Sequence, residues 1–95
     1  MLKREIVEED VVAALKKRVK ELGGMIEKFT SPARRSVPDE LITLPGGRII
    51  FVECKRPGKE PTVKQAKDHK RRRDLGCDVR VISTIEAARA FPDEA

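Results

Sequence analysis

A β-hairpin signal in the middle of the chain constrains the fold more than any other feature. Segments 37–44 and 48–55 are rich in apolar and β-branched residues, and Pro45-Gly46-Gly47 separates them. This pattern predicts two antiparallel strands joined by a tight turn. If the loop spans 45–47, Asp39 lies opposite Glu53, with Cβ atoms about 5 Å apart. A shorter Gly46-Gly47 loop would shift the register by one residue, and the two carboxylates would still be near neighbours.

The alternation of side chains along the second strand adds an amine to this pair of carboxylates. Lys55 falls on the same face as Glu53, whereas Cys54 points to the opposite face. Adjacent carboxylates repel each other unless a cation lies between them, and oxygen ligands suit Mg²⁺ or Mn²⁺. A Glu-x-Lys sequence is more often a solvent-exposed ion pair, but the apolar run 49–52 indicates an interior strand. The pattern therefore favours a site for metal-assisted cleavage of phosphodiesters.

Hydrophobic periodicity places the hairpin within a larger α/β order of elements. A first helix is predicted from about Glu5 to Leu22, followed by a strand over 25–29. After the hairpin, the sequence predicts a helix over 62–75, a strand over 78–82 and a last helix from 83 or 84 to 91. The resulting order is αβββαβα. We expect the 95 residues to form one domain, residues 1–95.

The charge balance favours a polyanionic partner. The chain has 21 Lys and Arg against 16 Asp and Glu, which gives a net charge of +5. It has no Trp or Tyr on which bases could stack, so contacts to backbone phosphates are expected rather than base readout. A basic run is often only a solubilising surface. Next to a carboxylate site, the candidate phosphate-binding residues are Lys28, Arg34, Arg35, Lys64, Lys67, Lys70 and Arg71.

The sequence also bears on the compartment. It contains no apolar run long enough to span a membrane and no signal-peptide pattern. We therefore expect a soluble cytoplasmic protein of a bacterial or phage-infected cell, with no membrane partner. In that compartment Cys54 and Cys77 are expected to remain thiols.

Two polar residues outside the hairpin are further candidates. Glu8 precedes Val11 and Leu15 at helical spacing, so it falls on the apolar face of the first helix, where a carboxylate is unusual. Alternatively, Glu5, Glu8 and Glu9, with Asp10, only complement the dipole at the helix N-terminus. Gln65 lies in the first turn of the basic helix, where its amide could donate to a phosphate or orient a neighbouring lysine, or be an ordinary surface residue.

An ordered set of motifs spans nearly the whole chain. It comprises Lys28-Phe29-Thr30-Ser31-Pro32, Ser36-Val37-Pro38-Asp39, Leu44-Pro45-Gly46-Gly47-Arg48, Phe51-Val52-Glu53-Cys54-Lys55-Arg56-Pro57-Gly58 and Gln65. In this order and spacing the chain resembles the virus-type replication-repair nuclease (VRR-NUC) domain, a branch of the PD-(D/E)xK nucleases that often occurs as a stand-alone phage or bacterial protein. The resemblance implies a restriction-endonuclease-like αβββαβα core with a mixed central sheet flanked by helices.

The resemblance also implies roles for individual residues. Asp39 and Glu53 would be metal-binding carboxylates for Mg²⁺ or Mn²⁺, and Lys55 the catalytic lysine. The helix glutamine of the family would be Gln65, and its first-helix glutamate would be Glu8. Its metal-binding backbone carbonyl would be that of Cys54. The chain departs from the family pattern at Ser36, where a glycine is usual, and in the ambiguity of the first-helix glutamate among Glu5, Glu8 and Glu9.

The function expected from the resemblance is hydrolysis of DNA phosphodiesters. Stand-alone members resemble resolvases of four-way (Holliday) junctions that act as homodimers in DNA repair, which would make branched DNA the substrate. A monomeric flap or nicking nuclease is the closest alternative. A non-catalytic DNA-binding module on the same scaffold, or a small regulatory protein that binds acidic proteins, would explain the charge but not the set of motifs.

Overall fold

The predicted order αβββαβα is confirmed in a computed structural model, which describes residues 4–93. Its elements are α1 (Glu8–Glu21), β1 (Met25–Lys28), β2 (Glu40–Leu44), β3 (Arg48–Cys54), α2 (Val63–Asp74), β4 (Val79–Ile82) and α3 (Ile85–Ala90). The strands form one sheet in the order β1-β2-β3-β4. The pairs β1–β2 and β2–β3 are antiparallel and the pair β3–β4 is parallel, so the sheet is mixed.

The hairpin adopts the register expected for a loop over 45–47. Leu44 pairs with Arg48 and Glu40 pairs with Val52. Continued by one residue, this register places Asp39 beside Glu53. Strand β2 starts at Glu40 rather than at residue 37, because Pro38 has no N–H to donate to a ladder. The Asp39 carbonyl instead accepts a hydrogen bond from the Phe29 N–H at 2.7 Å.

The first helix starts later than its periodicity predicts. The sequence indicates a start near Glu5, whereas α1 begins at Glu8. The Asp10 carboxylate accepts a hydrogen bond from the Val7 backbone N–H at 2.8 Å, which caps the first turn at that point. Arg4 also binds this carboxylate at 2.8 Å. Asp10 therefore caps the helix at Val7, and residues 4–6 lie outside the helix.

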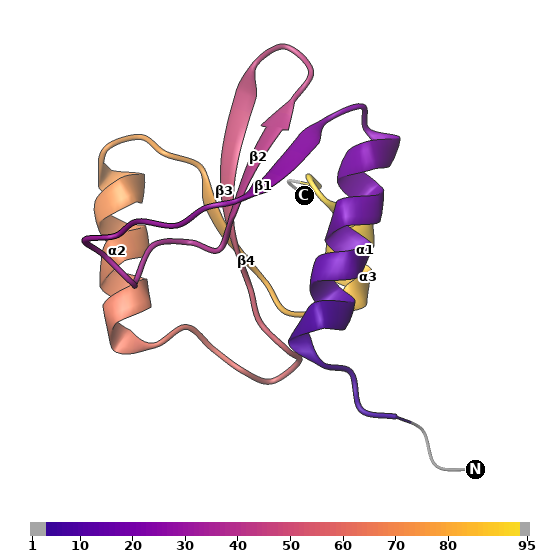
Figure 1. Ribbon diagram of the computed structural model, residues 1–95, viewed down its shortest axis with the longest axis horizontal. Coiled ribbons are helices and arrows are strands. Elements are labelled where there is room, and N and C mark those ends of the chain that lie inside the picture. Colours follow the sequence, from indigo (N-terminus) through magenta and orange to yellow (C-terminus); the bar gives the residue numbers. More distant parts are fainter. Residues whose placement is uncertain (1–3, 94–95) are drawn as a thin grey trace.

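The apolar core lies on one face of the sheet, under α1 and α3, whereas α2 covers the opposite face (Figure 1). From β3, the core receives Ile50, Val52 and the Cys54 side chain, because alternate residues of a strand share a face. The predicted inward position of Cys54 is confirmed: its side chain is fully buried and it remains a free thiol, as does Cys77. No helix in the part of the chain described is long and apolar enough to cross a membrane.

The layer between α2 and the sheet is polar. The buried residues of α2 are Asp68 and His69, so no apolar stripe attaches this helix. Instead, the Arg72 guanidinium binds Asp68 at 2.7 Å and lies 5.4 Å and 5.2 Å from the ring centroids of Phe29 and Phe51. Arg73 donates two hydrogen bonds to the Val79 carbonyl oxygen. These contacts hold α2 over the face of the sheet that carries Glu53.

Candidate active site

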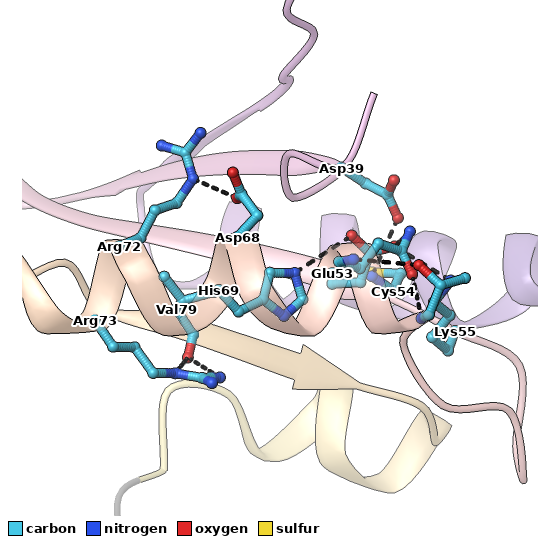
Figure 2. Close-up of polar contacts among 11 residues, drawn as sticks. Asp39, Glu53, Cys54, Lys55, Asp68, His69, Arg72, Arg73 and Val79 are labelled. Atoms are coloured by element: carbon cyan, nitrogen blue, oxygen red, sulfur yellow. Dashed lines mark hydrogen bonds and ion pairs between the residues drawn. The ribbon is translucent and has the colours of Figure 1, made fainter. Parts of the chain in front are cut away.

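Glu53 is the centre of a polar cluster between β3 and α2 (Figure 2). It is 1 % exposed. The Gln65 side-chain amide donates to its Oε2 atom at 3.3 Å, and the Lys55 Nζ atom lies 3.6 Å from the same oxygen. The His69 Nε2 atom lies 3.8 Å from the other oxygen, Oε1. The predicted grouping of Glu53 with Lys55 on one face is therefore present, and Gln65 joins it.

Asp39 approaches this cluster from the start of β2. Its Oδ2 atom accepts a hydrogen bond from the Cys54 backbone N–H at 3.3 Å, which holds the carboxylate beside the strand end that carries Glu53. Burial, and then the adjacent Asp39 carboxylate, raise the pKa of Glu53 from 4.5 to about 8 against the opposing effect of Lys55. Two carboxyl groups in this arrangement share a proton or a cation.

The capping of α2 fixes the orientation of the Gln65 amide. Thr62 is the N-cap, and its hydroxyl accepts from the Gln65 backbone N–H at 3.2 Å. In return, the Gln65 side-chain oxygen accepts from the Thr62 backbone N–H at 2.9 Å. Because the amide oxygen is used in this way, the amide nitrogen faces Glu53. Gln65 thus contacts Glu53 rather than the lysine, and helix capping positions it.

A cavity of about 390 Å³ opens next to Asp39, and Glu8 lines it. Glu8 and Asp39 therefore border the same space, with Lys28 and Glu9 also in the wall. Glu8 is exposed rather than buried on the apolar face, because it is the first residue of α1 and faces this opening. Glu5 lies before the helix and is not part of the cavity wall.

Two residues of this region have no place in the motif set. Glu40 is 3 % exposed, pairs across the sheet with Lys28 and lines the same cavity. Burial raises the pKa of Glu40, an effect that Lys28 and Lys16 oppose. In the sequence, strand alternation with Ile42 could have indicated that Glu40 lies on the buried face of its strand. His69 follows Gln65 by one helical turn, so helical spacing could have placed it beside Glu53.

The basic residues proposed for DNA binding separate into groups. Lys28 lines the cavity next to Asp39. A second cavity of about 280 Å³, between the β1–β2 connection and α2, is lined by Arg34, Ser36, Lys64, Lys67, Asp68 and Arg71. Lys70 pairs with Asp74 at 2.7 Å. Arg35 is exposed and lies outside both cavities. The structure thus brings four of these cations, Arg34, Lys64, Lys67 and Arg71, to the cavity between the β1–β2 connection and α2.

The oxygen atoms of the cluster fit a hard divalent cation. Among residues 4–93, no three His, Cys, Asp or Glu side chains are close enough to form a complete metal site. Mg²⁺ commonly binds through one or two carboxylates and keeps several waters. The buried Glu53 Oε1 atom has no hydrogen-bond partner in the described structure. Burial raises the pKa of the Cys54 thiol to about 12, so its sulfur is not a thiolate ligand, and only its backbone carbonyl is suited to a hard cation.

Comparison with known proteins places these features in context. No family model matches the sequence. The chain is 44 % identical over 89 residues to a protein of Acyrthosiphon pisum secondary endosymbiont phage 1 named "Putative nuclease p44", which covers 94 % of this chain and 96 % of that protein. A solved structure described as "VRR_NUC domain" matches with a TM-score of 0.84 and 31 % identity, over 93 % of this chain and 97 % of that one.

Proposed function

This chain belongs to the VRR_NUC nuclease family, and on that premise we propose that it is a metal-dependent endonuclease of branched DNA whose single domain comprises residues 1–95. The observation that supports this proposal most strongly is the buried cluster in which Lys55 and Gln65 contact one oxygen of Glu53, with Asp39 alongside. Carboxylates, an amine and an oriented amide are the groups needed to bind a cation and a phosphodiester together.

We assign the cation to the two carboxylates of the cluster. Asp39 and Glu53 would hold Mg²⁺ or Mn²⁺, with the Cys54 backbone carbonyl as a further oxygen ligand and Glu8 acting through water from the cavity wall. When bound, the ion supplies polarisation of a phosphoryl oxygen and lowers the pKa of an attacking water. A bound cation would also offset the burial and the repulsion from Asp39 that raise the pKa of Glu53.

The other two side chains of the cluster are Lys55, which stabilises charge on the phosphate, and Gln65, which positions Glu53. Lys55 is 8 % exposed, so its ammonium group is poorly screened and can stabilise the charge that develops on the phosphate as water attacks. The bond from phosphorus to the leaving sugar oxygen breaks with inversion at phosphorus. Gln65 holds the Glu53 carboxylate through its amide nitrogen, and helix capping keeps that amide in place.

The two cavities with basic walls suggest how DNA is held. Lys28 beside Asp39 would bind backbone phosphates, as would Arg34, Lys64, Lys67 and Arg71 at the cavity between the β1–β2 connection and α2. Residues 4–93 of one chain carry one such cluster, whereas symmetrical cleavage of a four-way junction needs two. We therefore propose a homodimer with two-fold symmetry, acting on replication or repair intermediates in the cytoplasm of a bacterial or phage-infected cell. A monomer that cuts flaps or nicks duplexes is the alternative.

The proposal is tested by cleavage of labelled four-way junction, flap and linear duplex DNA in Mg²⁺ or Mn²⁺. Wild type is compared with Lys55→Ala and with Lys59→Ala, a lysine of an exposed loop. We expect junction cutting that disappears in Lys55→Ala, persists in Lys59→Ala and comes from a dimer in sedimentation. Flap cutting by a monomer would favour the alternative. DNA binding without cleavage in either metal would leave only the non-catalytic module.

A further inference from the structure

His69 is a buried polar residue with no role in the proposed chemistry. It lies on α2 one turn after Gln65 and is 1 % exposed. Its Nε2 atom points at Glu53 Oε1 across 3.8 Å (Figure 2). In the described structure neither of these two buried atoms has a hydrogen-bond partner. Buried polar atoms without partners are rare in folded proteins, and two that face each other indicate an interaction completed when the site is in use.

The groups around this pair favour a hydrogen bond that His69 donates and Glu53 accepts. Glu53 Oε2 already has the Gln65 amide at 3.3 Å and the Lys55 ammonium at 3.6 Å, so Oε1 is the oxygen that needs a donor. A neutral imidazole has one N–H, and it can donate to a carboxylate without adding a charge that competes with a cation.

The backbone of His69 is held by its neighbours on α2. Asp68 binds Arg72 at 2.7 Å and Arg34 at 3.4 Å, and Arg73 donates to Val79 on β4. Arg73 thus links α2 to β4, and Asp68 links it to the β1–β2 connection through Arg34, while the Asp68–Arg72 pair lies within the helix. The imidazole is 1 % exposed, and a relative shift of about 0.6 Å or more between the two side chains would bring the 3.8 Å separation to hydrogen-bond length.

We propose that His69 is a positioning residue of the site, whose Nε2–H donates to Glu53 Oε1 and orients this carboxylate toward the cation. Glu53 is then held from two sides, by Gln65 at Oε2 and by His69 at Oε1. This inference rests on the proposed function in one respect only, the cation that Glu53 holds. Hydrogen bonds of this kind orient a ligand group and commonly change metal affinity about 10-fold to 100-fold when removed.

The first test reads the imidazole directly. The chain contains a single histidine, so a long-range ¹H–¹⁵N spectrum of tag-free, ¹⁵N-labelled protein shows His69 alone. We expect the Nε2–H tautomer both in EDTA at pH 9, where Glu53 is ionised, and in Mg²⁺ at pH 8. A ring protonated at Nδ1, with Nε2 as an acceptor or as a metal ligand, would overturn the proposal. This result requires no variant and no catalytic activity.

The second test measures metal affinity in variants by calorimetric titration with Mn²⁺. His69→Leu removes the donor and retains an apolar side chain of similar bulk, whereas His69→Gln keeps an amide N–H. We expect about 10-fold weaker Mn²⁺ binding in His69→Leu, binding within about 3-fold of wild type in His69→Gln, and unchanged DNA binding in EDTA for both. Equal affinities in wild type and His69→Leu, or equal losses in both variants, contradict a donor role. If wild type itself binds no Mn²⁺, the proposed function fails, and the tautomer still decides whether His69 donates to Glu53.

Discussion

Replacement of Glu53 by glutamine should stabilise the metal-free protein at pH 8 and change its stability little at pH 5. Burial and the adjacent Asp39 raise the pKa of Glu53 from 4.5 to about 8, so between these values the folded state holds a proton that the unfolded state has lost. Stability therefore falls as pH rises through this window, because the folded state binds more protons. Glutamine resembles the protonated acid in shape and is not subject to this loss.

The size of the effect follows from the width of the window. Each pH unit between the two pKa values costs about 1.4 kcal/mol of unfolding free energy. Between pH 5 and pH 8 the wild type should lose on the order of 3 kcal/mol relative to Glu53→Gln. Other titrating groups are present in both proteins, so most of their effect cancels in the comparison. Addition of Mg²⁺ at pH 8 should stabilise wild type only, because the variant lacks the second carboxylate.

The assay is urea denaturation in EDTA at the two pH values, followed by far-UV circular dichroism because the chain has no Trp. The reasoning predicts a stability difference between Glu53→Gln and wild type that grows by on the order of 3 kcal/mol from pH 5 to pH 8. An equal difference at both pH values would refute it. In that case Glu53 would be ionised without a penalty in the metal-free fold, and no carboxylate repulsion would need a cation.

Two further predictions concern the basic helix. Arg72→Ala should destabilise the protein by about 3 kcal/mol in urea denaturation, because it leaves the carboxylate of Asp68, which is 2 % exposed, without its closest partner. Replacement of the exposed Arg71 by alanine should cost under about 0.5 kcal/mol. Equal losses in the two variants would contradict the distinction between a buried ion pair at Arg72 and a solvent-exposed side chain at Arg71. Lys67→Ala should reduce the slope of log DNA affinity against log salt by about one unit, whereas Arg89→Ala on α3 should leave it unchanged. A slope unaffected by Lys67→Ala would exclude a phosphate contact there.

The parts of the account that the sequence could predict depend on local chemistry. The Pro45-Gly46-Gly47 turn determines the hairpin register, and strand alternation then separates Cys54, in the core, from Glu53 and Lys55. Each inference needs only neighbouring residues on one element or one hairpin. The order of elements follows in the same way, from periodicity and helix-ending residues.

The parts that could not be predicted depend on how elements pack together. Helical spacing places His69 one turn after Gln65, but its approach to Glu53 depends on the packing of α2 against β3, which spacing alone does not give. Arg72 reads as a member of a solvated basic helix, yet its guanidinium packs on Phe51 of β3 and binds the buried Asp68 of its own helix. Glu8 shows the reverse, since its helical position indicates burial and the cavity at the end of α1 leaves it exposed.

The central claim is that Asp39 and Glu53 form a cation site, and calorimetric titration with Mn²⁺ tests it most directly. Wild type is compared with Asp39→Asn, which retains the side-chain shape, and with Glu60→Gln, which removes a carboxylate from an exposed loop. We predict Mn²⁺ binding in wild type and Glu60→Gln that is lost in Asp39→Asn, with the fold unchanged by circular dichroism. Equal Mn²⁺ binding in Asp39→Asn and wild type, or none in wild type, would contradict the account.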